Sequence, residues 1–190
     1  TVNRSKETNM RLQLSLFLAC LLVITQAYSA DTLYDARFKK WQTEAEQGDP
    51  KAQYSLGNAY VRGNEVDRDI KQAISWFEKA AKQRHAKSEY KLGSIYYEDR
   101  YIKHNYKKAF NWLLKSARHG YHPAQFLLGK MYSNGQGTGK DLNKALSWLK
   151  KAKADQFLPV KDEIKKVERM IAATTKTEKK SKPVQAYVAP

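Results

Sequence analysis

Two Ser-x-x-Lys tetrapeptides are the first residues in this sequence whose types and spacing could do chemistry. Residues 88–91 read Ser-Glu-Tyr-Lys and residues 147–150 read Ser-Trp-Leu-Lys. This spacing pairs a serine nucleophile with a lysine base in β-lactamases and penicillin-binding proteins. Neither of the accompanying motifs, Ser-Asp-Asn or Lys-Thr-Gly, follows in the chain, and a Lys-rich sequence produces such matches by chance. Hydrolysis of cell-wall or lactam substrates therefore ranks behind a binding function, and we predict no enzyme.

Phosphate and metal chemistry find less support. Residues 135–141 read Gly-Gln-Gly-Thr-Gly-Lys-Asp. A phosphate-binding loop needs one more residue between its outer glycines, and a Ser or Thr at the position of Asp141. We interpret the segment as a turn between helices. A metal site needs three or four converging ligands, whereas four scattered His and one Cys are available. We predict no metal and no cofactor.

The beginning of the chain has the pattern of an export signal. Met10 and Arg11 precede an apolar run over residues 12–24, and small residues follow near Ala27 and Ala30. The run is shorter than the roughly 20 apolar residues of a membrane span. We predict an upstream extension plus a cleavable signal peptide over 1–30, and hence a periplasmic or secreted protein; an uncleaved anchor helix is the alternative. Cys20 lies inside the run, which disfavours lipidation.

The chain is strongly basic. It has 35 Lys and Arg against 19 Asp and Glu, and without residues 1–30 these become 32 and 18, a net charge of +14. Such a charge attracts an anionic surface or polyanion. The basic residues recur along the whole chain instead of forming one block. This distribution equally fits lysines that only solvate helix surfaces.

A repeat of 36 residues organises most of the sequence. Shifting the chain by 36 aligns the Leu-Gly pairs at 56–57, 92–93 and 128–129, each followed by a Tyr three residues later. The same shift aligns three alanines and three tryptophans: Ala73, Ala109, Ala145, Trp76, Trp112 and Trp148. Agreement at one fixed offset predicts a protein of stacked supersecondary units. We place the repeats at 49–84, 85–120 and 121–156.

Each repeat is predicted to form two helices. In the first repeat, small or apolar residues recur at spacings of three and four on both sides of a turn near Gly63. Asp69 and Asp141 precede second helices and can cap them. Gly57, Gly93 and Gly129 lie in the middle of first helices, where Gly costs about 1 kcal/mol relative to Ala. We expect the partner helix to approach closely there, with the Trp filling the space between repeats.

The ends of the chain look like modified units. Residues 32–47 align with a second helix, and residues 159–173 align with a first helix whose Gly position has become Lys165. We predict both as capping helices of a solenoid over 31–173. Residues 174–190 are Lys-rich with no helical pattern, and we predict a disordered basic tail.

These repeats resemble the Sel1-like repeat family, relatives of tetratricopeptide repeat proteins. The first repeat carries the family pattern at Ala52, Leu56, Gly57, Tyr60, Gly63, Val66, Asp69, Ala73, Trp76, Ala80 and Ala81. It departs at Glu65, where the family has Gly, and the second repeat departs at Asp99, Tyr101 and Asn105. The resemblance implies an all-α fold, a right-handed α-α superhelix of three Sel1-like helix pairs. It also implies an adaptor or scaffold function.

In the tetratricopeptide geometry, the first helices line the concave face of the superhelix. Residues beside the buried Leu-Gly positions are then our candidates for contacting a protein partner: Lys51, Tyr54, Asn58, Arg62, Lys87, Tyr90, Ser94, Tyr97, Phe126, Lys130 and Ser133. The aromatic members could equally pack in the interior. We therefore predict an exported, non-enzymatic scaffold that binds a protein partner. The alternative is a polyanion or envelope-surface binder; nucleic acid is disfavoured because export removes the chain from most of it.

Overall fold

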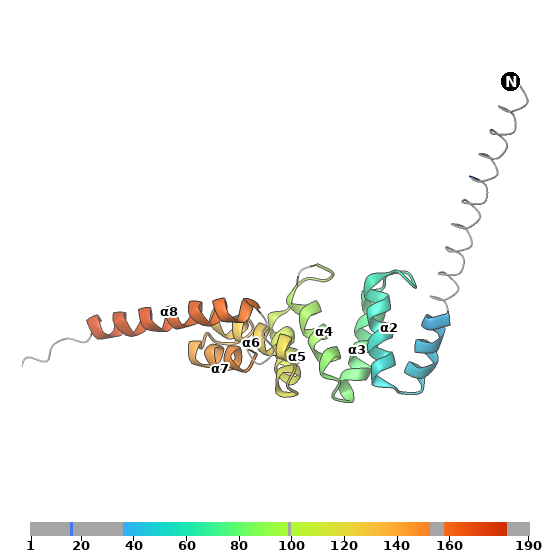
Figure 1. Cartoon of the computed structure of the whole chain (residues 1–190), viewed down its shortest axis with the longest axis horizontal. Helices are drawn as coiled ribbons and strands as arrows, with labels where there is room; N and C mark the ends of the chain where they lie inside the picture. The colour runs from blue at the N-terminus through green and yellow to red at the C-terminus, as the bar shows by residue number, and fades with distance from the viewer. Residues whose placement is uncertain (1–15, 17–35, 99, 153–157, 182–190) are drawn as a thin grey trace, which may run out of the picture.

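The structure, a computed structural model, describes residues 16, 36–98, 100–152 and 158–181. All the regular structure in these ranges is helical. Residues 36–46 form a helix, and three helix pairs and a long last helix follow. The pairs are α2 (Pro50–Arg62) with α3 (Ile70–Lys82), α4 (Ala86–Tyr97) with α5 (Tyr106–Arg118), and α6 (His122–Asn134) with α7 (Leu142–Ala152); α8 is Leu158–Ser181. The pairs stack side by side in chain order (Figure 1), as the predicted all-α solenoid requires.

The second helix of every pair begins with the same cap. The side-chain oxygens of Asp69, Asn105 and Asp141 accept backbone N–H bonds of 3.0, 2.9 and 2.9 Å from the residue three positions later. Each cap residue also donates its own N–H to a tyrosine carbonyl at the end of the preceding helix. Asn accepts such a bond as well as Asp does. The departure at Asn105 therefore leaves the start of α5 unchanged.

The loops between paired helices differ where the family glycines are missing. Helices α2 and α6 end at Gly63 and Gly135, both in the left-handed region with φ of 72°. Glycine adopts this conformation without strain. Helix α4 ends instead at Glu98 with φ of −88° and ψ of 137°, one residue earlier in the repeat. The second loop therefore leaves its helix in an extended direction.

The mid-helix glycines mark where the two helices of each repeat approach closely. A Cβ on Gly57 would lie 2.6 Å from Phe77, and one on Gly93 would lie 2.5 Å from Leu113. Gly129 meets Leu149 in the same way, at 2.7 Å. The expected close approach of the partner helix is therefore present. The side chain that fills it is this fully buried Phe or Leu, which directly follows the Trp in the sequence.

The three tryptophans lie half-buried on the second helices, each under a lysine. Lys79, Lys115 and Lys151 place their Nζ atoms 3.6, 4.3 and 4.4 Å from the centroids of Trp76, Trp112 and Trp148. The other side of each indole packs against the core; that of Trp76, for example, contacts the cluster of Ala45, Ala52 and Leu56. A cation over an indole gains about 0.5–1 kcal/mol at an exposed site. The tryptophans thus join neighbouring units and hold a lysine at the surface.

The two ends agree only in part with the prediction. Helix 36–46 lies within the predicted 32–47, and Ala45 is buried against α2. The last helix is longer than the predicted 159–173, because α8 continues to Ser181. Residues 174–181 are therefore helical and not part of a disordered tail; after Pro159 no Gly or Pro interrupts the chain until Pro183. The predicted signal segment, apart from Leu16, and residues 182–190 lie outside the described residues.

Candidate functional site

Five of the eleven predicted contact residues line two hollows on the face formed by α2, α4 and α6, which we call the first-helix face. The first hollow has a volume of about 230 Å³ and is lined by Trp41, Tyr54, Ser55, Asn58, Ala59, Arg62 and Glu65. The second has about 200 Å³ and is lined by Val61, Tyr90, Lys91, Ser94, Ile95, Glu98, Arg100 and Tyr101. The two are related by the repeat: Tyr90, Ser94 and Tyr101 follow Tyr54, Asn58 and Glu65 by 36 residues.

The first hollow combines an aromatic wall with charged groups. Trp41 and Tyr54 supply the rings, and Tyr54 leans on Phe77 with centroids 5.9 Å apart. Glu65 is 6% exposed, and its Oε1 atom accepts a bond of 3.2 Å from Arg37. Its Oε2 atom is buried without a hydrogen-bond partner. Asn58 spends one amide hydrogen on the carbonyl of Tyr54, at 3.0 Å.

The second hollow has the same plan with different residues. Tyr90 stands where Tyr54 stands in the first hollow and contacts Tyr121, with centroids 5.2 Å apart. The hydroxyl of Ser94 is buried and has no hydrogen-bond partner. Lys91, Glu98 and Arg100 line the hollow, so its charge is mixed with a basic excess.

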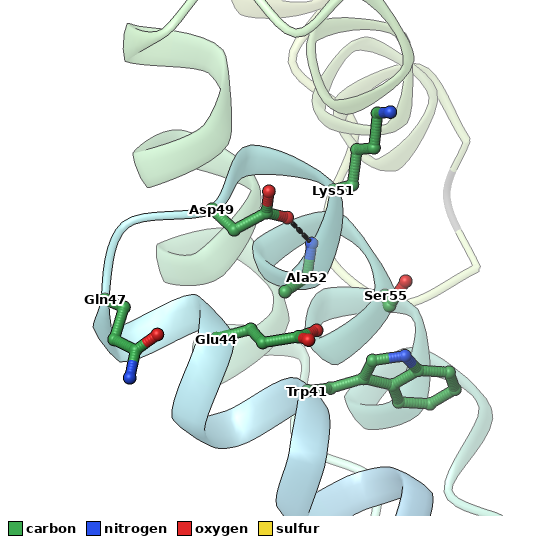
Figure 2. A pocket seen from close by; sticks show the side chains of 7 residues that line it. All are labelled: Trp41, Glu44, Gln47, Asp49, Lys51, Ala52 and Ser55. Carbon is green, nitrogen blue, oxygen red and sulfur yellow. Dashed lines mark hydrogen bonds between the residues drawn. The ribbon is translucent and has the colours of Figure 1, made fainter.

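A larger pocket continues the first hollow toward the N-terminal end of the solenoid (Figure 2). Its volume is about 580 Å³, and it shares Trp41 and Ser55 with the first hollow. Lys51 lines it with two carboxylates, Glu44 and Asp49. Asp49 is committed to capping α2, since its Oδ1 accepts from the N–H of Ala52 at 2.6 Å. Together the pocket and hollow form a continuous surface along α2.

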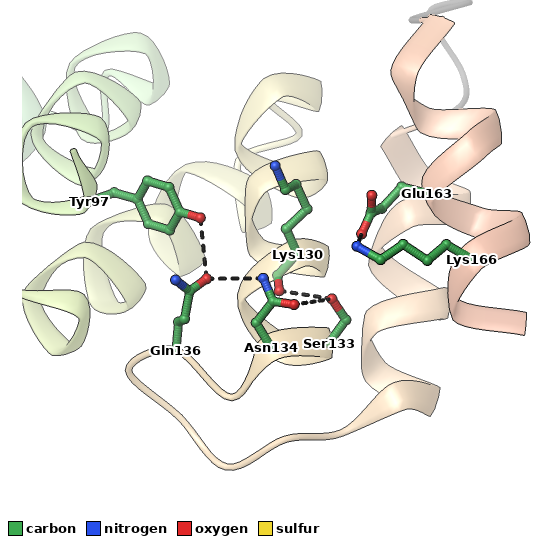
Figure 3. A network of polar contacts seen from close by, with 7 residues as sticks. All are labelled: Tyr97, Lys130, Ser133, Asn134, Gln136, Glu163 and Lys166. Atoms are coloured by element: carbon green, nitrogen blue, oxygen red, sulfur yellow. Dashed lines mark hydrogen bonds and ion pairs between the residues drawn. The ribbon is translucent and has the colours of Figure 1, made fainter. Parts of the chain in front are cut away.

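In the third repeat, polar groups at the end of α6 bind one another (Figure 3). Ser133 is 1% exposed, and its hydroxyl donates to the carbonyl of Lys130 at 2.9 Å. Gln136 accepts from both Tyr97 and Asn134, at 3.2 and 3.3 Å. Burial raises the pKa of Tyr97, which keeps its hydroxyl protonated and able to donate. Ser133 therefore cannot contact a partner, and Tyr97 is tied to the third repeat.

The other predicted contact residues are accessible but lie outside the hollows. Lys87 is exposed at the start of α4. Phe126 and Lys130 are half-buried on α6, with the Lys130 Nζ atom 5.7 Å from the centre of the Phe126 ring. The structure thus brings together Tyr54, Asn58 and Arg62, and separately Tyr90 and Ser94. Trp41, Glu65 and Tyr101 were missed, although the departures of Glu65 and Tyr101 from the repeat pattern were a signal.

The serines of the two Ser-x-x-Lys pairs differ in exposure and in their neighbours. Ser88 is fully buried, with its hydroxyl 2.8 Å from the Nδ1 atom of His85. Ser147 is exposed on α7 and lines none of the hollows described above. Burial lowers the pKa of His85, and Lys87 adds to the effect. Within residues 36–98, 100–152 and 158–181, no three His, Cys, Asp or Glu side chains converge as metal ligands would.

A buried acid was also missed in the sequence. Glu89 is 1% exposed, and its Oε2 atom lies 2.7 Å from the Nδ1 atom of His119. One repeat earlier the same two positions hold Gln53 and Gln83. There the side-chain amide of Gln83 donates a hydrogen bond of 3.0 Å to the side-chain oxygen of Gln53. The pair therefore replaces a neutral link between paired helices by an ionisable one. It lies in the interior and not in either hollow.

The second helices carry most of the positive charge of the repeats. Helices α3, α5 and α7 contain ten Lys or Arg, all exposed, against the single acid Glu78. The first helices contain five basic residues and Glu89. Besides the lysines over tryptophan, Lys108 and Lys144 lie 5.2 and 5.8 Å from the rings of Tyr96 and Tyr132. We call this surface the second-helix face.

A row of stacked helix pairs, with buried clusters following one another along the row, defines an α-solenoid repeat protein. The model of the Sel1 repeat matches residues 50–85, 86–121 and 122–155, more than half of the chain. The chain therefore belongs to the Sel1 repeat family. In the described part of the chain no helix is long and apolar enough to cross a bilayer.

Known proteins of this kind share the fold over part of the chain. A secretory immunoglobulin A-binding protein, EsiB of Escherichia coli O6:H1, is 35% identical over 66 residues, which are 35% of this chain and 14% of that protein. The solved structure of a protective antigen of uropathogenic Escherichia coli with an SLR fold is 37% identical with a TM-score of 0.59, covering 63% of this chain and 25% of that one. A Sel1 repeat protein from Oxalobacter formigenes is 28% identical with a TM-score of 0.62, covering 67% and 96%.

Helicobacter pylori cysteine-rich protein B shares the fold alone, at 18% identity, with a TM-score of 0.50 over 60% of this chain and 85% of that one. The chain spans only about a seventh of EsiB and a quarter of the protective antigen. These likenesses fix the architecture. Sel1 repeat proteins typically serve as protein-interaction scaffolds.

Proposed function

We propose that this chain is a non-catalytic scaffold that binds a protein partner through the two hollows of its first-helix face. The observation that carries the proposal is the pair of hollows one repeat apart, lined by residues of α2 and α4. Their aromatic walls and mixed charges suit a peptide chain better than a small molecule, because two small hollows recur one repeat apart instead of forming one deep pocket. One relative, EsiB, is named for binding an immunoglobulin, which supports a protein partner here.

A displayed library of random 12-residue peptides tests this function. Ser55 lines both the N-terminal pocket and the first hollow, so Ser55→Arg fills them with a long side chain. We expect peptides selected on the unmodified chain to bind Ser55→Arg at least tenfold more weakly. Ser75→Arg makes the same change on the exposed surface of α3 in the same repeat and is the matched control. Selected peptides that bind both variants equally well would refute the proposal.

Export to the periplasm or beyond is part of the proposal. Its support is the apolar run over residues 12–24 with small residues after it. We expect the protein recovered from the periplasm or the medium to begin at Tyr28 or Ala30, as its N-terminal sequence would show. Recovery only from the cytoplasm with residues 10–30 intact would contradict export.

Polyanion binding is a second candidate, favoured by the charge of the second-helix face. Three neighbouring helices carry ten exposed cations, several of them over rings, against the acid Glu78, and Lys144 pairs with Asp141 at 3.0 Å. Affinity for duplex DNA, used as a model polyanion, should fall steeply with salt, and each contributing lysine should account for about one unit of the logarithmic slope. We expect changing Lys79, Lys115 and Lys151 together to Gln to flatten the slope. An unchanged slope would remove this candidate.

A further inference from the structure

Each hollow is lined by one residue that carries a buried side-chain oxygen without a partner in the described part of the chain. These atoms are Oε2 of Glu65, which lines the first hollow, and Oγ of Ser94, which lines the second. Buried polar atoms are nearly always hydrogen-bonded, since an unmade bond leaves desolvation uncompensated. Both exceptions occur on the one face where a partner is expected.

The third repeat shows that this absence is a property of the first two repeats and not of the fold. Lys130 occupies the Ser94 position, and the one buried serine hydroxyl on that face, Ser133, donates to the carbonyl of Lys130. Gly137 occupies the position of Glu65, and it packs directly against the backbone carbonyl of Tyr106. Neither of the two unpartnered buried oxygens of the described residues lies there.

We propose that the partner is an extended acidic peptide segment whose backbone peptide groups bond Glu65 and Ser94, one in each hollow. This inference rests on the proposed function and names the class of partner. A carboxylate oxygen can only accept, so Glu65 takes a backbone N–H; a serine hydroxyl can accept an N–H or donate to a C=O. Peptide groups supply both. The two hollows lie one repeat apart, on α2 and α4, and an extended chain runs about 3.3–3.6 Å per residue between them.

The charges beside the hollows favour acidic side chains on that segment. Glu65 is already paired with Arg37, so a cation entering the first hollow would meet Arg37 and Arg62. The second hollow offers Lys91 and Arg100 against Glu98. In such a segment, a backbone N–H group would bond the buried oxygen in each hollow. Acidic side chains beside it would pair with the cations around the hollows.

Binding requires a small change in the free structure. Neither oxygen is accessible to solvent, so each side chain must rotate into its hollow to meet the segment. Staggered side-chain wells are separated by single-bond rotations, so the change needed is a change of rotamer.

Two substitutions test the proposal on a synthetic peptide obtained from the library selection. Ser94→Ala removes the hydroxyl. Glu65→Gln keeps one oxygen for Arg37 and turns the other atom into an N–H donor that opposes a peptide N–H. We expect about fivefold weaker binding for Ser94→Ala, the worth of one neutral hydrogen bond, and a larger loss for Glu65→Gln. Ser94→Ala should also raise the melting temperature of the free protein or leave it unchanged, because it deletes an unsatisfied group.

Ser133→Ala is the matched control, since its hydroxyl is satisfied within the third repeat. It should bind the peptide as the unmodified chain does and melt at a lower temperature. Replacing peptide N–H groups by N-methyl groups one at a time should reveal at least one position in the hollow-bound stretch where affinity falls. If Ser55→Arg abolishes binding while Ser94→Ala and Glu65→Gln bind normally, this inference is wrong and the proposed function stands. If Ser55→Arg has no effect, the proposed function itself is wrong.

Discussion

The first two repeats and the third repeat share an interior but present different surfaces. In all three, a mid-helix glycine receives a fully buried Phe or Leu from the second helix, and an Asx side chain caps that helix. On the first-helix face, Glu65 and Tyr101 line hollows, whereas Gly137 at the same register packs against the backbone of Tyr106. The comparison teaches that packing within the solenoid constrains the mid-helix glycine positions. The loop position held by Glu65, Tyr101 and Gly137 varies between repeats and can contribute to a binding surface.

The largest expected effect comes from breaking the shared interior. Gly93→Val places a branched side chain where even a Cβ would lie 2.5 Å from Leu113 and 3.3 Å from its backbone nitrogen. Overpacking of this kind costs about 3 kcal/mol or more. We expect a large drop in the urea midpoint of unfolding. Gly139→Ala, with nothing within 4 Å of its Cβ, is the control and should unfold like the unmodified chain.

Disturbing the packing of the Gly137 loop in the third repeat should destabilise the protein somewhat less. Gly137 has φ of 70°, and its Cβ would collide with the carbonyl of Tyr106. Gly137→Ala should therefore destabilise the protein by about 2–3 kcal/mol, from backbone strain and displaced packing. The converse change, Glu65→Gly, removes only a partly exposed ion pair and should cost less than about 1 kcal/mol. Equal losses for the two variants would contradict the difference between the repeats.

The Glu89–His119 pair offers a sharper comparison between the first and second repeats. His119→Leu leaves a buried carboxylate without its partner and should cost about 2–3 kcal/mol. Glu89→Gln combined with His119→Gln reproduces the side-chain hydrogen bond between Gln53 and Gln83 and should restore most of that stability. Chemical denaturation of both variants measures this. A double variant as unstable as His119→Leu would show that two glutamines cannot form this hydrogen bond in the second repeat.

The smallest effect concerns the cap of α4. Asp49 caps α2 through its side chain, whereas His85 at the same register makes no cap bond. His85→Asp should add about 1 kcal/mol by supplying that bond. Because burial lowers the pKa of His85 in the folded chain, its contribution to stability is complete above the ordinary value near 6.5 and is lost as pH falls below it. The stability advantage of the variant over the unmodified chain should therefore grow between pH 8 and pH 5.

The fold was predictable because the repeat is written in short-range patterns. The spacing of Leu56, Gly57 and Tyr60 marks a helix face, and the 36-residue offset repeats it three times. The cap at Asp69 and the turn at Gly63 are local as well. The end of α8 was missed, because a Lys- and Thr-rich stretch without an apolar face still continues a helix when nothing interrupts it.

The candidate site was only partly predictable. Tyr54, Asn58 and Arg62 were identified from their places beside the Leu-Gly positions, and they meet in the first hollow. Trp41 and Glu65 were missed, since each reaches that hollow from another element of the chain. Ser133 was included wrongly, because its hydroxyl turns back to its own helix, a choice among side-chain rotamers that spacing does not report.

The sequence by itself determined the 36-residue repeat, the paired helices and the buried mid-helix glycine contacts. These depend on neighbours within one or two helical turns and on the constant spacing between repeats. The tertiary structure alone decided which polar groups find partners and which charges lie together. Glu89 meets His119 across 30 residues, and lysines spread evenly through the sequence share one face because their spacing equals the repeat. Hydrogen bonds and charge interactions act over a few ångströms in space, so they are settled only when the helices have stacked.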